Sequence, residues 1–434
     1  MKAVIMAGGQ GTRLSSVLKD IPKPMVRISG KPLLEYQIEN LKDNKITDII
    51  LIIGHLGDVI KDHFKDGSRF GVQISYYVEE KPLGTAGALY YLKEKLKDDF
   101  ILLYGDVFVD INFNRFAEYH KNKGGVATLY THPNSHPYDS DIVLTDDNSC
   151  ITAWNHKNSV RVEDYKNQVN AGVYVFSPTI LEEITENTKI DLEKQIIASY
   201  IEKGLVYSYL CSEYVKDIGT PDRLTKVELD YTNGVCQQKN LKNKQKCIFL
   251  DRDGTINHHV GFLNHHEQMQ LEENVAKAIQ KMNESEYLAI VISNQPVLAR
   301  GECSFEELEK IHNRMETLLG EEGAYIDGLY YCPHHPDSGF TGEVKELKKI
   351  CTCRKPEIGL LEKAVKDFNI DLKESWFVGD TTIDIQTGKN AGMKTVLLST
   401  GEAGNDKKYN VKADLENKDL LQTINYILNE RKRK

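Results

Sequence analysis

The sequence predicts an α/β fold built from two doubly wound domains, and three observations lead to this prediction. Short apolar runs alternate with segments of helical spacing, which is the order of parallel strands and their crossover helices. This series occurs twice, with a polar, basic stretch between the two copies. The chain has 434 residues, which is more than one hydrophobic core usually organises.

The first series begins with an apolar strand at 3–6 and continues with a helix at 31–41, whose apolar side chains recur every three or four positions. Residues 49–53 form a continuous apolar run, as expected for a strand that is buried on both faces. A helix at 86–96 and a strand at 100–104 follow. Residues 1–232 are therefore predicted to form the first domain.

Segment 233–246 is predicted to be the interdomain linker because it is polar, basic and poor in apolar residues. Residues 247–434 are predicted to form the second domain, in which the order of strands and helices is repeated. Its expected strands lie at 247–250, 288–292 and 376–378, and its expected helices lie at 274–282, 305–319 and 414–434.

Charge and composition narrow the range of functions. The formal net charge of -9 disfavours nucleic acid or an anionic membrane surface as the main partner. No apolar run reaches the ~20 residues of a membrane span, and the first residues lack the pattern of a signal peptide. We therefore expect a cytoplasmic protein with small-molecule partners. The sequence leaves assembly into a homo-oligomer open.

A glycine-rich turn follows the first predicted strand and carries Gly8, Gly9, Gly11, Thr12 and Arg13. Glycines at a strand-to-helix turn let backbone N–H groups approach phosphate oxygens, and an arginine adds a fixed cation. Lys23 follows in a stiff bend between two prolines. The dinucleotide-binding and P-loop patterns do not fit these residues. The alternatives are another kind of phosphate site or a plain tight turn, and the two cations favour the phosphate site.

The first predicted domain resembles the sugar-nucleotide pyrophosphorylase family. The resemblance is carried by GGQGTRL at 8–14, PKPM at 22–25, GKP at 30–32, GTAG at 84–87, YGD at 104–106, NAG at 170–172 and DIGT at 217–220. It implies a nucleotidyltransferase domain of Rossmann-like fold that binds a nucleoside triphosphate. Attack on a phosphorus atom needs charge neutralisation and in-line positioning more than covalent help, which agrees with these residue types.

The resemblance also implies a role for each matching residue. The implied nucleotide-binding residues are Gly8, Gly9, Gly11, Thr12, Arg13, Lys23, Glu79, Gly84 and Thr85. Among them, Arg13 and Lys23 would act in catalysis by neutralising phosphate charge. Asp106 and Asp217 would hold Mg²⁺, while Asn170 and Lys157 would contact the sugar phosphate. The chain departs from the family pattern at His156, where a glutamate is usual.

Two aspartates open the second predicted domain. Asp251 and Asp253 follow directly after the apolar run 247–250, at a strand end where doubly wound folds place their active sites. An EF-hand calcium loop also contains Asp-x-Asp-Gly, but Ile256 and Phe262 do not supply its remaining ligands. Acidic turns on a surface are the other alternative.

Later strands of this half are also followed by polar groups, and their order resembles the haloacid dehalogenase (HAD) superfamily. Ser293 comes after one strand, Lys355 precedes a helix, and Asp380 comes after another strand. The resemblance implies that Asp251 attacks phosphorus and forms an aspartyl-phosphate, and that Asp253 acts as general acid and then as general base. Ser293 and Lys355 would stabilise the phosphoryl oxygens. Asp251, Asp380 and the backbone carbonyl of Asp253 would hold Mg²⁺.

A predicted structural zinc site consists of Cys332, His334, Cys351 and Cys353. Three thiolates and an imidazole complete a tetrahedral set and leave no open position. His335 is a rival ligand, and the alternative to a metal site is a group of reduced cysteines. Because Lys355 follows this loop closely, the zinc would position the catalytic lysine.

The motifs DRDGTIN at 251–257, SNQPVLARG at 293–301, YYCPHHP at 330–336 and CTCRKP at 351–356 resemble heptose 1,7-bisphosphate phosphatases and, less closely, histidinol phosphatases. This resemblance implies that Asn294, Arg300 and Arg354 contact the substrate. Thr381 stands where the heptose enzymes have a lysine.

Together, the two resemblances imply synthesis of GDP-heptose for surface glycans. The second domain would remove the C7 phosphate of D-glycero-α-D-manno-heptose 1,7-bisphosphate. The first domain would then transfer GMP from GTP to heptose 1-phosphate and release pyrophosphate. One alternative is a hexose-1-phosphate nucleotidyltransferase fused to a histidinol-phosphatase-like domain. Another is that one half is a non-catalytic sensor or scaffold.

Overall fold

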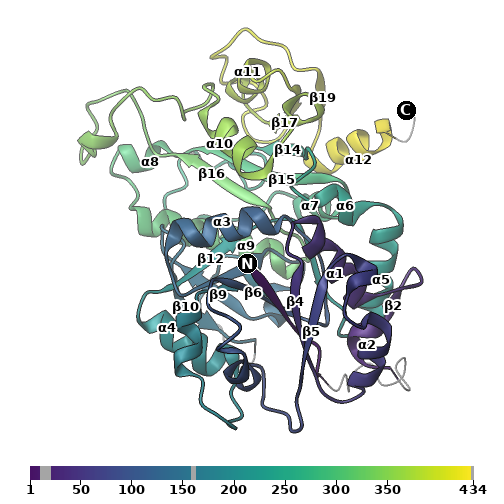
Figure 1. Ribbon diagram of the computed structural model, residues 1–434. Coiled ribbons are helices and arrows are strands. Elements are labelled where there is room, and N and C mark those ends of the chain that lie inside the picture. Colours follow the sequence, from purple (N-terminus) through teal and green to yellow (C-terminus); the bar gives the residue numbers. More distant parts are fainter. Residues whose placement is uncertain (10–20, 158–162, 432–434) are drawn as a thin grey trace. The chain divides into compact units, whose positions relative to one another are not determined.

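The computed structural model describes residues 1–9, 21–157 and 163–431, which form two compact units (Figure 1). The first unit comprises Met1–His132, Val143–Asn155 and Val169–Asn240, and the second comprises Pro133–Ile142, His156–Gln168 and Leu241–Lys434. The division at Asn240 falls inside the segment predicted to be a linker. Part of that segment, Val235–Lys239, forms the short helix α6, in which Cys236 is fully buried. The limits 1–232 and 247–434 stay predictions.

The first unit contains a mixed sheet of nine strands in the order β10-β9-β11-β6-β1-β4-β5, with β8 paired to β11 and β12 paired to β8. Strand β1 is parallel to β4 and β6, whereas β11 is antiparallel to β6 and β8. These strands are β1 (Lys2–Met6), β4 (Asp48–Ile53), β5 (Gln73–Val78), β6 (Phe100–Tyr104), β8 (Ala127–His132), β9 (Ile142–Thr145), β10 (Ile151–Asn155), β11 (Val169–Phe176) and β12 (Val206–Leu210). The three strands predicted in this half are confirmed, and the antiparallel strands are an addition to the predicted winding.

Helices and short strands complete the first unit. Its other helices are α1 (Leu33–Asp43), α2 (Gly57–Phe64), α3 (Phe113–Lys123), α4 (Ala198–Glu202) and α5 (Pro221–Thr232). Its short strands are β2 (Arg27–Ile28), β3 (Lys31–Pro32), β7 (Val107–Asp110) and β13 (Tyr214–Asp217). The helix predicted at 86–96 is wrong in type and length, since only Gly87–Leu92 is helical and it is a 3₁₀ helix. The chain is tightly packed there, because a Cβ added at Gly87 would lie 2.3 Å from the carbonyl oxygen of Thr188.

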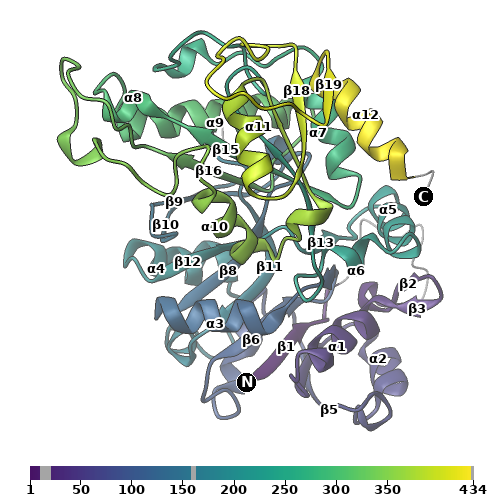
Figure 2. The same cartoon turned by 90° about the horizontal axis from the view of Figure 1, so that it is seen from above.

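The second unit contains a fully parallel sheet in the order β16-β15-β14-β17-β18-β19. Figure 2 labels β15, β16, β18 and β19 of this sheet. The strands are β14 (Lys246–Leu250), β15 (Tyr287–Asn294), β16 (Gly328–Cys332), β17 (Trp376–Gly379), β18 (Lys394–Leu398) and β19 (Leu415–Asn417). The helices are α7 (Val275–Asn283), α8 (Pro296–Ala299), α9 (Phe305–Glu321), α10 (Gly359–Phe368), α11 (Thr382–Asn390) and α12 (Leu420–Arg431).

Strand β14 shows why this sheet is doubly wound. Its alternate residues Ile248 and Leu250 belong to a core with α7, α9 and α12, whereas Cys247 and Phe249 belong to a core with α10. The predicted α/β class with two domains of this kind is confirmed. The prediction of one helix over 414–434 is wrong, because β19 occupies Leu415–Asn417 and α12 begins at Leu420.

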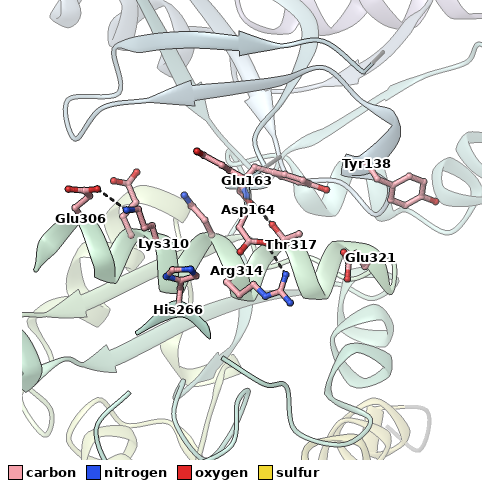
Figure 3. A pocket seen from close by; sticks show the side chains of 12 residues that line it. Tyr138, Glu163, Asp164, His266, Glu306, Lys310, Arg314, Thr317 and Glu321 are labelled. Carbon is pink, nitrogen blue, oxygen red and sulfur yellow. Dashed lines mark hydrogen bonds and ion pairs between the residues drawn. The ribbon is translucent and has the colours of Figure 1, made fainter. Parts of the chain in front are cut away.

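Two segments from the first half of the sequence belong to the second unit, and α9 holds one of them. The backbone N–H of Tyr165 donates to Thr317 Oγ1 at 2.9 Å, and that of Asn167 donates to Glu316 Oε2 at 2.8 Å. Arg314 of the same helix pairs with Asp164 (Figure 3). Among the described residues, no helix is both long enough and apolar enough to cross a membrane.

Candidate active sites

A lysine and two aspartates come together in the first unit. Lys23 begins a 3₁₀ turn between Pro22 and Pro24, and its ammonium donates to Asp106 Oδ2 at 2.5 Å. Asp106 follows β6, and its backbone carbonyl accepts a hydrogen bond from the Ile218 N–H at 3.1 Å. Asp217 immediately precedes Ile218, so the two predicted metal ligands lie on adjacent chain segments. The structure therefore brings Lys23, Asp106 and Asp217 to one place.

Asp217 has a cationic partner that the sequence did not indicate. Arg223 of α5 donates to its carboxylate, and the Gly219 N–H donates to Oδ1 at 2.8 Å. Burial alone would raise the pKa of Asp217, but the hydrogen bond and charge of Arg223 hold that pKa below its usual value. Carboxylates such as those of Asp106 and Asp217 are the oxygen ligands that Mg²⁺ prefers, so these residues fit the predicted metal.

Close packing explains two of the predicted nucleotide-binding positions. A Cβ added at Gly8 would lie 2.8 Å from Glu79 Oε2, so a larger residue in the turn after β1 would require this carboxylate to move. Burial raises the pKa of Glu79, and the Leu83 N–H donates to its Oε1 at 3.2 Å. An added Cβ at Gly9 would meet nothing within 4 Å. Three other predicted residues lie outside the described residues, namely Gly11, Thr12 and Arg13.

The predicted turn at Gly84 and Thr85 packs against the segment that contains Ile190. Gly84 has a φ of +80°, and a Cβ added there would lie 2.3 Å from the Ile190 carbonyl oxygen. The Thr85 N–H donates to that same oxygen at 3.0 Å, and Thr85 Oγ1 accepts from the Leu192 N–H at 2.7 Å. The glycine is therefore required by a backbone contact, whatever ligand the turn binds.

Asn170 belongs to a hydrogen-bonded chain that ends on a carboxylate. Its Nδ2 donates to the Tyr174 hydroxyl at 2.9 Å, which donates to Glu193 Oε1 at 2.8 Å. The Tyr104 hydroxyl donates to the same oxygen at 2.5 Å. Burial raises the pKa of Glu193. Sequence reasoning missed Glu193, because nothing distinguishes it from the charged residues Asp191 and Lys194 beside it.

Lys157 and Asn170 belong to different units of the structure. Lys157 is exposed in a turn after β10 that belongs to the second unit, and its backbone N–H donates to Asp141 Oδ1 at 2.8 Å. His156 Nδ1 lies 3.7 Å from the same carboxylate oxygen. The predicted role of Lys157 stays a prediction.

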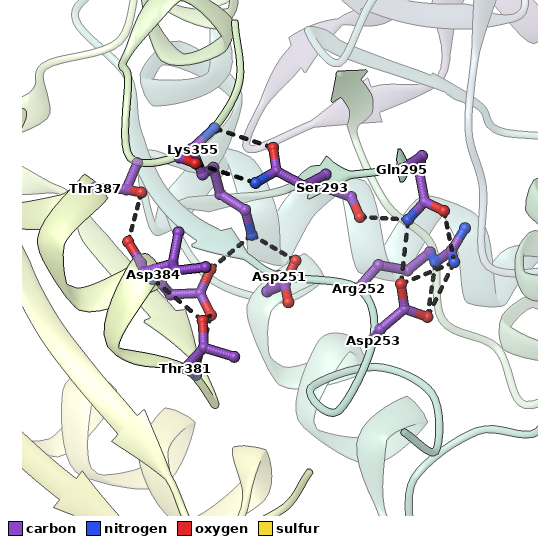
Figure 4. A network of polar contacts seen from close by, with 11 residues as sticks. Asp251, Arg252, Asp253, Ser293, Gln295, Lys355, Thr381, Asp384 and Thr387 are labelled. Atoms are coloured by element: carbon purple, nitrogen blue, oxygen red, sulfur yellow. Dashed lines mark hydrogen bonds and ion pairs between the residues drawn. The ribbon is translucent and has the colours of Figure 1, made fainter. Parts of the chain in front are cut away.

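In the second unit, Lys355 bridges two carboxylates at the carboxyl ends of the parallel strands. Its Nζ lies 2.6 Å from Asp251 Oδ1 and 2.6 Å from Asp384 Oδ1 (Figure 4). Asp251 follows β14 and Asp380 follows β17, and carboxylate oxygens of these two residues and of Asp384 all lie within 4.8 Å of one another. Sequence reasoning missed Asp384. Its indication was an acidic residue one helical turn beyond Asp380. At the start of α11, Thr381 Oγ1 accepts from the Asp384 N–H, and the Asp384 carboxylate accepts from the Thr381 N–H at 3.1 Å.

This carboxylate group fits a divalent cation. The side chains of Asp251, Asp380 and Asp384 are buried, and Asp380 Oδ1 has no hydrogen-bond partner. Burial and the neighbouring Asp384 raise the pKa of Asp251 to about 7, while burial and Asp251 raise the pKa of Asp380 to about 8. One ammonium cannot balance three buried carboxylates, and an orphan carboxylate oxygen is a ready ligand for Mg²⁺.

Two glycines lie close to the carboxylate of Asp380. A Cβ added at Gly254 would lie 2.3 Å from Asp380 Oδ2, and one added at Gly401 would lie 2.1 Å from the same atom. Both residues have positive φ, at +78° and +53°. The orientation of Asp380 therefore depends on two positions that lack a side chain.

The carboxylate of Asp253 is held apart from that group. Arg252 Nη2 donates to both of its oxygens, and Asn257 and Gln295 donate at 3.0 and 3.1 Å. Burial alone would raise the pKa of Asp253, but the charge of Arg252 holds that pKa below its usual value. The side chain of Asp253 is therefore no member of the carboxylate cluster in the described structure. The contact predicted for its backbone carbonyl stays a prediction.

Three further predicted residues of this half are Ser293, Asn294 and Arg354. Ser293 Oγ accepts from Gln295 Nε2 at 2.7 Å. Asn294 clamps the Lys355 backbone, because its Oδ1 accepts from the Lys355 N–H at 3.0 Å and its Nδ2 donates to the Lys355 carbonyl at 3.2 Å. Arg354 Nη1 donates to the His334 carbonyl oxygen at 3.1 Å.

Arg300 belongs to a cluster of cations and aromatic rings. Its guanidinium carbon lies 4.1 Å from the ring centre of Phe262 and 4.7 Å from that of Phe340, and Lys348 Nζ lies 4.5 Å from the Phe340 ring centre. Both Arg300 Nε and Lys348 Nζ are buried without a hydrogen-bond partner. Glu343 Oε2 lies 3.6 Å from Lys348 Nζ. Buried cationic donors without a hydrogen-bond partner suit an anionic ligand.

The ligand atoms of the four predicted zinc ligands lie close together. Cys332 Sγ lies 3.5 Å from Cys351 Sγ and 3.2 Å from Cys353 Sγ, and His334 Nδ1 lies 3.3 Å from Cys353 Sγ. All three cysteines are free thiols. His335, the rival ligand, instead accepts from the Asp337 N–H at 3.2 Å. The geometry thus favours His334 and fits a tetrahedral ion.

Comparisons with known proteins identify a different family in each half of the chain. Residues 2–234 match the nucleotidyl transferase family, and residues 352–423 match the HAD-hydrolase-like family. The chain is similar to D-glycero-beta-D-manno-heptose-1,7-bisphosphate 7-phosphatase from Haemophilus ducreyi, with 37% identity over 185 residues that cover 42% of this chain and 98% of that protein.

Two relatives match the first half. UTP–glucose-1-phosphate uridylyltransferase from a Synechocystis species is 34% identical over 221 residues, which cover 48% of this chain and 57% of that protein. The catalytic subunit beta of mannose-1-phosphate guanylyltransferase from Drosophila pseudoobscura pseudoobscura is 31% identical over 260 residues, which cover 59% of this chain and 67% of that protein. The chain thus spans little more than half the length of the uridylyltransferase.

Proposed function

The chain belongs to the nucleotidyl transferase family and carries a phosphatase of the HAD superfamily in its second half, and from this premise we propose that both halves act on one heptose. The second half removes the C7 phosphate of D-glycero-D-manno-heptose 1,7-bisphosphate. The first half then transfers GMP from GTP to the resulting heptose 1-phosphate and releases pyrophosphate. The product is GDP-heptose, an activated sugar for surface glycans.

The buried group around Lys355 carries the phosphatase part of the proposal. Asp251 is the nucleophile that attacks the phosphorus atom, and Lys355, which lies 2.6 Å from it, stabilises the phosphoryl oxygens. Asp253 gives a proton to the leaving sugar oxygen and later takes one from water. Ser293 donates to a phosphoryl oxygen. Mg²⁺, held by Asp251, Asp380 and Asp384, would neutralise phosphate charge.

The transferase part is supported by the meeting of Lys23, Asp106 and Asp217 near the end of β1 and β6. Lys23 neutralises the charge of the nucleoside triphosphate, and the turn at Gly8 holds its phosphates. A second Mg²⁺ at Asp106 and Asp217 would add charge neutralisation there. Zinc bound by Cys332, His334, Cys351 and Cys353 would fix the loop that leads to Lys355.

Two arguments support the base and the sugar, and the resemblance of the motifs to the heptose enzymes implies the α anomer. One relative of the first half is a guanylyltransferase and another a uridylyltransferase, so GTP follows the guanylyltransferase. The phosphatase relative is named for the β anomer, whereas we propose the α anomer. A 1,7-bisphosphate is a substrate on which both halves can act. The phosphatase removes its C7 phosphate, and the C1 phosphate remains for nucleotidyl transfer.

The order of the two steps tests the proposal. A sugar pocket that fits the C7 hydroxyl must desolvate a C7 phosphate without matching cations, so discrimination of at least ~100-fold is expected. With Asp251→Asn protein, the α-bisphosphate and GTP should yield almost no nucleotide-sugar. Added heptose 1-phosphate should restore GDP-heptose formation.

Controls separate the alternatives. Asp106→Ala should abolish nucleotidyl transfer and leave phosphate release near wild type. Formation of GDP-heptose that still carries its C7 phosphate would contradict the order, and a preference for ATP, UTP or dTTP would contradict the base. Faster turnover of the β-bisphosphate would contradict the anomer. Faster turnover of mannose 1-phosphate and histidinol phosphate would favour the hexose alternative.

A further inference from the structure

Among the described residues of the second unit, a third group of side chains could hold a metal ion, and it takes no part in either proposed reaction. It consists of His265, His266 and Glu307, whose ligand atoms all lie within 4.8 Å of one another. His266 Nδ1 lies 2.6 Å from Glu307 Oε1, and His265 Nε2 lies 3.8 Å from the same oxygen. The two imidazole rings stack, with centroids 4.5 Å apart and an angle of 28° between their planes.

Backbone hydrogen bonds fix these residues independently of any ion. Gln268 Oε1 accepts from the Asn264 and His265 N–H groups, each at 3.1 Å, and so closes the turn that carries both histidines. The His266 N–H donates to Glu307 Oε1 at 2.8 Å. Glu307 lies in the first turn of α9, where its own N–H donates to the capping Ser304 hydroxyl at 3.0 Å. The two elements are therefore held at a fixed spacing, which lowers the cost of organising ligands around a metal.

Metal binding would change the tautomer of His265. In the structure, its Nδ1 accepts a hydrogen bond from the Glu267 N–H at 3.4 Å. Coordination through Nε2 would instead place a hydrogen on Nδ1, and Glu267 Oε2, which lies 3.8 Å from Nδ1, is the carboxylate that would orient the ring. His266 presents Nδ1 directly to Glu307. Both rings thus direct one nitrogen toward the same carboxylate.

The local charge favours a cation. His266 lines a hollow of about 880 Å³ together with Glu163, Glu306 and Glu309 (Figure 3). The two basic residues on this wall are already paired, since Lys310 contacts Glu306 at 2.8 Å and Arg314 contacts Asp164 at 3.1 Å. The remaining carboxylates leave an acidic surface beside the histidines, and such a surface raises the local concentration of cations.

We propose that His265, His266 and Glu307 bind a divalent transition-metal ion. Two imidazole nitrogens and one carboxylate oxygen are ligands for Zn²⁺, Ni²⁺ and Co²⁺, and they leave coordination positions open to water because all three side chains reach solvent. This donor set differs from the three carboxylates around Lys355 and from the cysteine group. The proposal does not depend on the identity of the sugar or the nucleotide.

A metal here ties the loop that follows β14 to helix α9. That loop starts at Asp251 and Asp253, passes Phe262, and reaches the two histidines. Phe262 packs against Arg300, with 4.1 Å between the ring centre and the guanidinium carbon. Metal binding therefore restrains the segment that carries Phe262. This restraint should be visible as slower hydrogen exchange in that segment.

Nickel titration of full-length, tag-free protein tests the proposal. The protein retains its tightly held zinc, and excess Mg²⁺ in the buffer occupies the carboxylate groups that prefer oxygen-bound ions. Calorimetry should show about one equivalent of Ni²⁺ bound. His265→Ala and Glu307→Gln should each weaken binding by at least ~10-fold, since loss of a mere outer-shell partner already costs 10–100-fold.

His258→Ala is the matched control, because His258 forms another exposed histidine–glutamate pair on the same loop, 3.7 Å from Glu272. It should leave Ni²⁺ affinity unchanged. Hydrogen exchange of peptide 256–269 should slow on Ni²⁺ addition in the wild type and not in Glu307→Gln. Equal Ni²⁺ binding by the wild type and by the His265→Ala/Glu307→Gln double variant, with both folded by circular dichroism, would overturn the proposal.

Discussion

Arg252 donates from Nη2 to both carboxylate oxygens of the next residue, Asp253, at 2.9 and 2.8 Å. The Arg252 side chain is fully buried, and its Nη1 lies 3.3 Å from His312 Nε2. Burial lowers the pKa of His312 well below its usual value, so this ring is neutral. Asp253 is therefore the charged partner of Arg252. The proposed general acid is thus oriented by its neighbour in the chain.

Replacing Arg252 should change how the phosphatase responds to pH. The charge of Arg252 lowers the pKa of Asp253, so Arg252→Met should raise that pKa and move the alkaline limit of kcat/KM to higher pH. The rate at the optimum should fall by about 10-fold or more because the orientation of the acid is lost. His312→Asn is the control and should leave the alkaline limit in place. A variant Arg252→Met with an unshifted profile would contradict this role.

The effect of Mg²⁺ on stability should increase with pH. The pKa of Asp251 is raised to about 7 and that of Asp380 to about 8. The metal-free folded state therefore binds protons more tightly than the unfolded chain does. Its stability from these groups is complete below about pH 4 and is lost as the pH rises toward 8. Mg²⁺ relieves the repulsion, so its increase in Tm should be larger at pH 8 than at pH 6.

Differential scanning fluorimetry measures this directly, with Asp380→Asn as the control. That variant removes the carboxylate with the orphan oxygen, so its Tm should respond little to Mg²⁺ at either pH. An equal Mg²⁺ effect at both pH values in the wild type would show that these carboxylates do not repel one another as inferred.

Zinc should be required for the second unit to hold Lys355 in place. Dialysed protein should contain about one tightly bound zinc per chain, by the four-ligand rule. Cys351→Ser should lose it, unfold at a lower temperature and lose phosphatase activity. Cys150→Ser is the control, since Cys150 is a free, half-buried thiol of the first unit. Zinc-free protein with full phosphatase activity would disprove the structural role.

Lys348 should recognise the second phosphate of the substrate. Its Nζ and Arg300 Nε are buried without hydrogen-bond partners, and a charged hydrogen bond of about 1.5–3 kcal/mol corresponds to roughly 10–100-fold in rate. Lys348→Met should therefore lower kcat/KM for the bisphosphate by that factor. The exposed neighbour Lys349 provides the control Lys349→Met, which should act like the wild type.

A substrate that lacks the C1 phosphate tests whether Lys348 acts through that phosphate. Heptose 7-phosphate lacks the group that Lys348 would bind, so Lys348→Met should leave its kcat/KM nearly unchanged. A parallel loss for both substrates would mean that Lys348 supports the fold and does not contact the C1 phosphate.

Several buried strands and the polar residues that follow them were predictable from the sequence, because both follow from local patterns. An apolar run predicts a buried strand, and parallel strands bring their carboxyl ends to one edge. In the structure, Asp251 lies beside Lys355, from which it is 104 residues away in the sequence, and also beside Asp380. Lys23 and Asp106, which the family resemblance assigned to one site, are in contact.

Contacts that depend on packing were not predictable. Arg223 meets Asp217, and Asp384 meets Lys355, only because α5 and α11 start at the positions that aim these side chains inward. The helix expected at 86–96 is limited by the backbone contact at Gly87, which a single sequence does not reveal. The attachment of Tyr165 to Thr317 has no local pattern either, because it joins segments 152 residues apart.

The two glycines against Asp380 restrict how this protein can diverge. Every other amino acid has a Cβ, and at Gly254 or Gly401 that atom would lie 2.3 or 2.1 Å from Asp380 Oδ2. A lineage can therefore keep all of its acidic residues and still lose phosphatase activity through one codon change at either glycine. Relatives with an intact set of aspartates but a larger residue at one of these positions are expected to retain only nucleotidyl transfer, and surveys that score the acidic residues alone would misassign them.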